Sequence, residues 1–171
     1  MKQLVVYMFF FIGLQGICQA QNQDKSFTIY LVRHAEKAWS FNPFNPLLTE
    51  CGRLRAVNLQ RLMKDTGIKD IYSTDYKRTM ATAGQTANAH GLTIQHYDSH
   101  KLEAFSQLLL DGKQDALIVG HSETTSVLAG MLVEEDRAAL DGSEYDYLYQ
   151  VVIDNAKRRI EVRRQEFLCN E

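Results

Sequence analysis

The sequence has little of what marks extended, repetitive or heavily cross-linked proteins. It contains two prolines, both between residues 42 and 46, and three cysteines in 171 residues. We find no internal repeat, no low-complexity segment and no linker that would separate two domains. A chain of this size and composition is expected to form one globular domain with its own core.

A surplus of one charge sign is also missing, since the formal net charge is −2 at pH 7. Nothing in that balance points to a nucleic acid or to an anionic membrane surface. The spacing of His, Cys, Asp and Glu residues does not match a metal-binding motif. We therefore expect no nucleic-acid partner, no metal and no other cofactor.

Only one long hydrophobic run occurs, at residues 4–14, and a lysine precedes it. The small residues of Cys18-Gln19-Ala20 follow, which predicts a signal peptide over residues 1–20 with cleavage after Ala20. The run is short for a membrane span, although a retained anchor stays an alternative. We predict export, to the periplasm or the medium, of a single domain over residues 21–171. Lipidation at Cys18 is left open.

Export would place Cys51 and Cys169 in an oxidising compartment, where disulfides persist. A disulfide needs its two Cα atoms close together, and the sequence does not give that distance. We therefore leave the bridge open and expect two structural thiols as the simpler case.

Apolar segments of strand type alternate with segments of helical periodicity along most of the chain. Thr49, Asp75 and Ser99 are the residues expected to cap three of the helices. The last two strands flank a turn at Asp154-Asn155 and have the pattern of a hairpin with one wet face. The pattern predicts an α/β fold, a three-layer sandwich with a mainly parallel central sheet and a C-terminal antiparallel hairpin at an edge. The expected strands span residues 27–33, 69–73, 92–97, 116–119, 147–153 and 159–167.

Basic side chains follow three of the predicted strands, at the point where each strand ends. They are Arg33 and His34, then Arg78, then His121. Parallel strands bring their carboxyl ends to one edge of a sheet, where ligand sites gather. Guanidinium groups match phosphate oxygens with two parallel bonds, so the sequence predicts a phosphate pocket at that edge.

These residues lie in motifs that resemble the histidine phosphatase superfamily, which has the phosphoglycerate-mutase-like fold. Ala35 stands where that family usually has glycine, Trp39 matches a tryptophan of its mutase-type members, and Ser40 replaces their asparagine. The short interval between residues 97 and 115 resembles the compact branch, which includes the phosphohistidine phosphatases. The matching segments are Leu31-Val32-Arg33-His34-Ala35-Glu36, Leu48-Thr49-Glu50-Cys51-Gly52-Arg53, Ser73-Thr74-Asp75-Tyr76-Lys77-Arg78-Thr79-Met80-Ala81-Thr82-Ala83 and Gly120-His121-Ser122.

The resemblance implies a metal-independent phosphomonoester hydrolase with His34 as the nucleophile that becomes phosphorylated. Arg33, Arg78 and His121 would hold the phosphate oxygens, and Ser122 would add a hydroxyl or amide contact. The substrate would be a small phosphorylated compound. Its identity and the oligomeric state of the protein are not predicted.

The leaving group needs a proton donor, which the family's mutase-like members supply from a glutamate between the third and fourth strands. Glu103 lies in that interval, but its place in the first turn of a predicted helix also suits a solvated glutamate. Glu36 is the second candidate. Glu123 is disfavoured, because the start of a helix would lower its pKa. The acid therefore stays open.

Three other functions were weighed. A phosphoglycerate-mutase-like phosphotransferase is less favoured, because the chain is short. A serine hydrolase would use Ser122, but Thr124 stands where a nucleophile elbow has its final glycine. A binding module without catalysis would be expected to have lost His34 or its arginines, and all are present.

Overall fold

The structure is a computed structural model that describes residues 26–39, 41–42, 44–155, 157–167 and 169. The predicted signal peptide at residues 1–20 and Ser40 lie outside these residues. The helices are α1 (Glu50–Met63), α2 (Lys77–His90), α3 (Leu102–Gly112) and α4 (Thr125–Val133). The strands are β1 (Phe27–Arg33), β2 (Asp70–Ser73), β3 (Ile94–His96), β4 (Ala116–Gly120), β5 (Tyr147–Asp154) and β6 (Lys157–Arg164).

All six strands join one sheet in the order β3-β2-β4-β1-β5-β6. Strands β3, β2, β4 and β1 are parallel to one another. Strand β5 runs antiparallel to β1, and β6 pairs antiparallel with β5, so the two form a hairpin at the edge. Arg33 pairs with Gly120, and Ser73 pairs with Val119. The carboxyl ends of β1, β2 and β4 therefore lie level at one end of the sheet, and the predicted fold class is confirmed.

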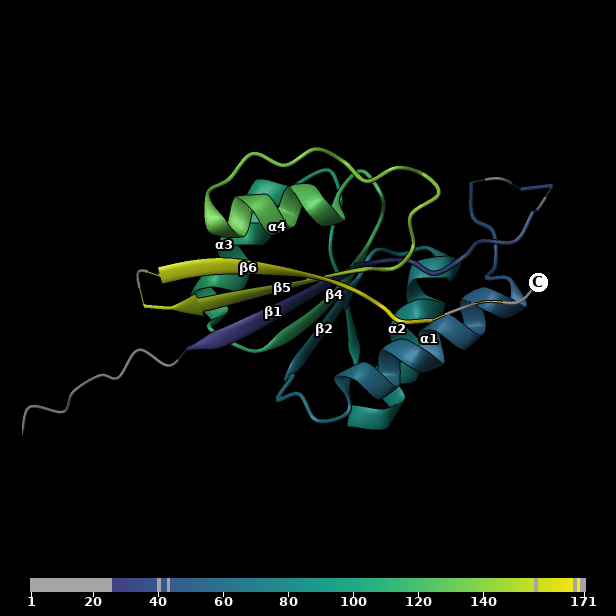
Figure 1. The fold of residues 1–171 in the computed structure, drawn as a ribbon, viewed down its shortest axis with the longest axis horizontal. Helices are drawn as coiled ribbons and strands as arrows, with labels where there is room; N and C mark the ends of the chain where they lie inside the picture. The colour runs from purple at the N-terminus through teal and green to yellow at the C-terminus, as the bar shows by residue number, and fades with distance from the viewer. Residues whose placement is uncertain (1–25, 40, 43, 156, 168, 170–171) are drawn as a thin grey trace, which may run out of the picture.

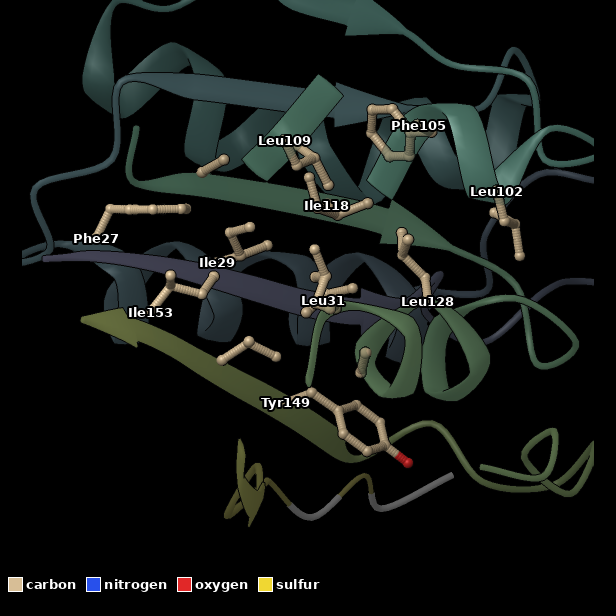
Figure 2. Packing of buried hydrophobic residues seen from close by; sticks show 14 residues of the cluster. Phe27, Ile29, Leu31, Leu102, Phe105, Leu109, Ile118, Leu128, Tyr149 and Ile153 are labelled. Carbon is tan, nitrogen blue, oxygen red and sulfur yellow. The ribbon is translucent and has the colours of Figure 1, made fainter. Parts of the chain in front are cut away.

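Helices cover both faces of the sheet, with α1 and α2 on one side and α3 and α4 on the other (Figure 1). Alternation along β1 explains the two faces, because Ile29 and Leu31 point toward α3 and α4 while Val32 packs on the α1 and α2 side. Figure 2 shows the first of these cores, in which Phe105 of α3 and Leu128 of α4 meet the buried strands. These fully buried strands hold the sheet ends in fixed positions.

Helix starts followed the predictions only in part. Thr49 caps α1, and its hydroxyl accepts a hydrogen bond from the Gly52 amide at 2.9 Å, as expected. The predictions for Asp75 and Ser99 were wrong, because the N-cap of α2 is Tyr76 and that of α3 is Lys101. Neither Tyr76 nor Lys101 makes a side-chain cap bond.

Contacts outside the expected caps explain both differences. The first amide of α2, on Lys77, donates to Oδ1 of Asn45, which comes from the loop between β1 and α1. Ahead of α3, Asp98 accepts a hydrogen bond from the backbone amide of His100 and forms a separate turn. The first contact comes from a segment 32 residues away, whereas the second is a local turn in which the Asp98 side chain competes with the expected cap. No helix in the described part of the chain is long and apolar enough to cross a membrane.

Candidate active site

The fold brings the predicted basic residues together at the carboxyl end of the sheet. Arg33 and His34 end β1, Arg78 lies in the first turn of α2, and His121 follows β4. The ring centres of His34 and His121 are 5.6 Å apart, and Nη2 of Arg78 lies 3.4 Å from Nδ1 of His121. Arg33, His34 and His121 are buried. Two imidazoles and two guanidinium groups thus share one site.

The hydrogen bonding of His34 fixes which ring nitrogen is free to react. Nδ1 lies 2.8 Å from the carbonyl oxygen of Ala35. A carbonyl only accepts, so Nδ1 carries the proton and Nε2 keeps its lone pair. Burial, with Arg33, Arg78 and His121 adding to it, lowers the pKa of His34 to about 3. The imidazole is therefore neutral at pH 7, as a nucleophile must be.

His121 is held in the opposite tautomer. Arg78 only donates, so Nδ1 of His121 accepts from it, and Nε2 then carries the proton and donates to the Thr74 hydroxyl at 2.9 Å. The Thr74 hydroxyl donates in turn to Thr79. Burial and then Arg78 lower the pKa of His121 to about 4. This buried chain orients a neutral His121 toward the site.

The hydrogen-bond partners of the Arg33 side chain are backbone carbonyl groups and not carboxylates. Its Nη1 donates to the carbonyl oxygens of Asp141 at 3.1 Å and Glu144 at 2.9 Å, and its Nε is buried without a hydrogen-bond partner. Tyr145 covers the guanidinium, with the ring centre 4.1 Å from Cζ of Arg33. The same ring lies 6.0 Å from that of His34. A buried guanidinium with spare donors is suited to bind an anion.

Tyr145 was missed by the sequence analysis, although one signal for it exists. It comes just before β5, and β5 runs antiparallel to β1. The start of an antiparallel strand lies at the same end of the sheet as the ends of the parallel strands. A residue that precedes β5 is therefore placed beside residues that follow β1 and β4.

Arg78 is fixed from another direction. Its Nη1 donates to the carbonyl oxygen of Phe44 at 3.0 Å, and the Tyr76 ring centre lies 4.6 Å from its Cζ. Its Nε is also buried without a partner. No ion pair of the described residues involves Arg33 or Arg78. The two arginines thus make no ion pair among the described residues, and Glu123 is the carboxylate that lines the same cavity.

Ser122 is buried next to His121, and its hydroxyl helps to lower the pKa of the Glu123 carboxyl group. The ring nitrogens of His121 are occupied by Thr74 and Arg78. Ser122 therefore lacks the histidine partner that a serine nucleophile needs there.

The candidate acids are separated by their surroundings. Glu36 receives Nη2 of Arg55 at 2.6 Å and Nε at 2.9 Å, so this carboxylate is occupied by a guanidinium. Glu103 is exposed on α3. Glu123 has a lowered pKa, because its own backbone amide, the Ser122 hydroxyl and the nearby cations outweigh the effect of desolvation. The lowered pKa of Glu123 does not suit a proton donor, and the contacts of Glu36 and Glu103 do not single out either one as the acid.

A cavity of about 410 Å³ opens beside the two basic side chains Arg78 and His121. That volume falls within the usual range of small-molecule sites, about 300–1,000 Å³. The described residues contain no group of three or more His, Cys, Asp or Glu side chains that could hold a metal ion. The residues that line the cavity are Tyr76, Arg78, Ser99, His100, Leu102, His121, Glu123 and Thr124.

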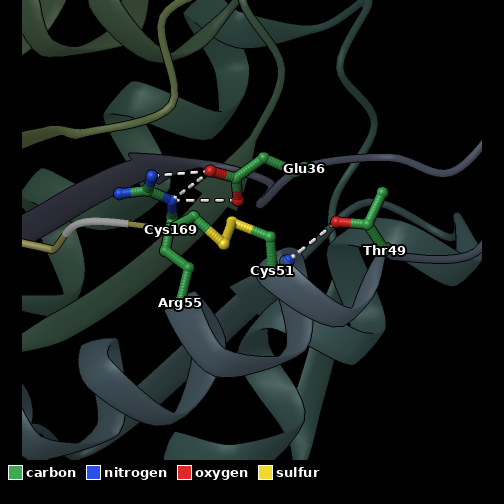
Figure 3. Close-up of a disulfide and its surroundings, with 6 residues drawn as sticks. Glu36, Thr49, Cys51, Arg55 and Cys169 are labelled. Carbon is green, nitrogen blue, oxygen red and sulfur yellow. Dashed lines mark hydrogen bonds and ion pairs between the residues drawn. A yellow bond between two sulfur atoms is a disulfide. The ribbon is translucent and has the colours of Figure 1, made fainter. Parts of the chain in front are cut away.

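Next to the site, Cys51 and Cys169 form a disulfide with their Cα atoms 5.7 Å apart. The expectation of two free thiols was wrong, because the chain folds back over 118 residues and brings its end onto α1. Figure 3 shows this bridge beside the Glu36–Arg55 pair. The ring centre of Phe167 lies 4.9 Å from Cζ of Arg55 and covers the pair.

Comparisons with known proteins agree with this geometry. Residues 29–101 match the model of the histidine phosphatase superfamily (branch 1). Among curated proteins, none matches the sequence of this chain.

Solved structures share the fold at low sequence identity. The structure of the protein histidine phosphatase SixA complexed with tungstate has a TM-score of 0.67 at 14% identity, over 81% of this chain and 97% of that one. A mycobacterial glucosyl-3-phosphoglycerate phosphatase has a TM-score of 0.64 at 11% identity, over 82% of this chain and 98% of that one. YhfR from Bacillus stearothermophilus has a TM-score of 0.63 at 16% identity, over 80% of this chain and 96% of that one. Over residues 29–101 this chain is thus similar to the histidine phosphatase superfamily, and the solved structures share its fold.

Proposed function

We propose that this protein is a phosphomonoester hydrolase that forms a phosphohistidine on His34. The observation that carries the proposal is the tautomer of His34. Its Nδ1 proton is held by the Ala35 carbonyl, which leaves the Nε2 lone pair for a phosphorus atom. The guanidinium groups of Arg33 and Arg78 are suited to hold the phosphate oxygens. The sequence also assigned this contact to His121, but its Nε2 proton is donated to Thr74 and its Nδ1 accepts from Arg78, so His121 acts by orienting Arg78.

In the first step, Nε2 of His34 attacks phosphorus while the bond from phosphorus to the leaving-group oxygen breaks. That oxygen takes the bonding electron pair and needs a proton. In the second step, a water oxygen attacks the phosphohistidine and releases inorganic phosphate, and His34 regains its lone pair. Arg33 and Arg78 stabilise the charge on the transferred group through both steps.

Hydrolysis is favoured over the other functions by the openness of the site. The only helix between β3 and β4 is α3, so no larger lid from this interval covers the cavity beside Arg78 and His121. A mutase must shield its phosphorylated intermediate from water. The ring nitrogens of His121 face Thr74 and Arg78, which argues against a serine hydrolase that uses Ser122.

The direct test is to trap the phosphoenzyme. Wild-type protein is mixed with a labelled aryl phosphate and quenched, and the label is expected to be acid-labile and absent in His34→Ala. His96→Ala, which changes an exposed histidine on β3, serves as the matched control and should label normally. Equal labelling of wild type and His34→Ala would refute the mechanism.

Inhibitors and chelators test the class of enzyme. Tungstate or vanadate should inhibit by occupying the phosphate pocket, and a fluorophosphonate should not label Ser122. Activity that disappears in the presence of a chelator and returns with a metal would contradict the metal-independent chemistry proposed here.

We also propose that the protein is exported, with residues 1–20 removed. The Cys51–Cys169 disulfide supports this, because such bridges persist in oxidising compartments. Mass spectrometry of the protein from fractionated cells should find a chain that begins at Gln21. A full-length chain in the cytosol would contradict the proposal.

A further inference from the structure

One histidine of the candidate site has no role in holding phosphate. His100 follows β3, in a turn closed by a 2.9 Å hydrogen bond from its backbone amide to Oδ1 of Asp98. It lines the 410 Å³ cavity whose wall also contains Arg78 and His121. The carboxyl end of β3 thus contributes a third histidine to the edge where β1, β2 and β4 end.

The cavity is larger than a phosphate group requires. Arg78 and His121 occupy the part of its wall that belongs to the phosphate site, and the remainder includes Ser99, His100 and Leu102. With phosphorus next to His34, the leaving group must extend away from the nucleophile, since attack and departure are in line. His100 lines the part of the cavity beyond Arg78 and His121, which is the space that we assign to the leaving group.

The carboxylates do not fill the role of proton donor. Glu36 is bound by Arg55 through two of its donors, and Glu103 does not line the cavity. Glu123 lines it, but its environment favours the ionised form. A histidine side chain changes its charge between about pH 5 and 8, so both the donor and the acceptor form that acid–base catalysis needs are populated near neutral pH.

We infer that His100 is the general acid that protonates the leaving group, an inference that rests on the proposed function. As the bond from phosphorus to oxygen breaks, the leaving oxygen takes the electron pair and then a proton from the imidazolium. Neutral His100 accepts a proton from the water that attacks the phosphohistidine. Each turnover thus returns both histidines to their starting states, and no other reactant is needed.

Groups of both signs face His100. Arg78 lies on the wall of the same cavity, where Tyr76 and His121 are the titratable neighbours. Glu123 lines the same wall, and Asp98 lies on the turn of His100, where it is paired with Lys101 at 3.7 Å. The cavity and the turn thus supply charged groups of both signs around His100.

A series of leaving groups tests this role. An alkyl phosphate needs a proton on its departing oxygen, whereas dinitrophenyl phosphate does not. His100→Gln should lower kcat/KM about 10²–10⁴-fold for the alkyl phosphate and less than about threefold for dinitrophenyl phosphate. The limb of the pH profile that falls as pH rises should also disappear for the alkyl phosphate.

Controls separate this inference from the function on which it depends. His96→Gln, on the exposed part of β3, should behave as wild type with both substrates. Equal losses on both substrates for His100→Gln would mean a structural or binding role and overturn the inference, as would a selective loss in Glu123→Gln instead. If the wild type hydrolyses neither substrate, the proposed function itself is wrong.

Discussion

Two buried arginines, Arg33 and Arg55, lie on either side of the same loop and have opposite surroundings. Arg55 is paired with the carboxylate of Glu36, covered by Phe167 and flanked by a disulfide (Figure 3). Arg33 donates to two backbone carbonyls and has no carboxylate partner. Each side chain keeps one buried donor without a partner, Nε of Arg33 and Nη1 of Arg55, so the carboxylate is the difference between them. A buried charge with a partner fixes structure, whereas one without a partner is kept for a ligand.

Replacing Arg33 is the change expected to have the largest effect on activity. Arg33→Ala should lower kcat/KM by about 10³-fold or more, because a fixed guanidinium on the transferred phosphoryl group is lost. The free energy of unfolding should fall by about 2 kcal/mol or less, since only bonds to backbone carbonyls disappear. Aryl phosphate kinetics and urea denaturation measure the two quantities. A large loss of stability with activity retained would mean that Arg33 has the structural role that we assign to Arg55.

Replacing Arg55 should produce the opposite pattern. Arg55→Met leaves the Glu36 carboxylate without its partner and should lower the free energy of unfolding by about 3–5 kcal/mol. The loss of kcat for the folded protein should be much smaller than in Arg33→Ala. Adding Glu36→Gln should recover part of the stability in a double-mutant cycle. Additive losses would show that the two side chains are not coupled.

The disulfide should contribute less than the ion pair. Cys51→Ser combined with Cys169→Ser should lower the free energy of unfolding by about 2–4 kcal/mol, mainly because the unfolded chain gains freedom. Phosphate binding, measured by calorimetry, should be nearly unchanged. A loss of phosphate affinity equal to that of Arg33→Ala would mean that the bridge positions the site as well as the chain end.

Acid should weaken the pocket gradually. The pKa values of His34 and His121 are lowered to about 3 and about 4 in the folded protein, against an ordinary value near 6.5. Below pH 6.5 the unfolded chain therefore binds more protons than the folded one, and stability falls as pH falls.

The expected slope is about 1.4 kcal/mol per pH unit for each histidine until its folded pKa is reached. Denaturation of wild type and His34→Ala between pH 4 and 7 measures it. The variant should show a shallower slope, and an identical slope would mean that His34 does not contribute.

Local patterns in the sequence were sufficient for the fold and for the basic residues of the site. Alternating apolar segments identified the strands, and the basic residues after three of them predicted one shared edge. The same reasoning failed at Asp75, because the start of α2 is satisfied by Asn45 from a distant loop. It also missed Tyr145 and His100, whose roles depend on which strand ends lie next to each other.

By itself, the sequence determined the α/β class, the order of the elements and the four basic residues, because strand and helix periodicity and motif spacing are local properties of the chain. Only the tertiary structure decided that Cys51 meets Cys169, that Glu36 belongs to Arg55, and that His100 lines the cavity. Those facts are distances between segments far apart in sequence. Burial and hydrogen-bond partners, which set the protonation states of His34 and His121, exist only once these segments have packed.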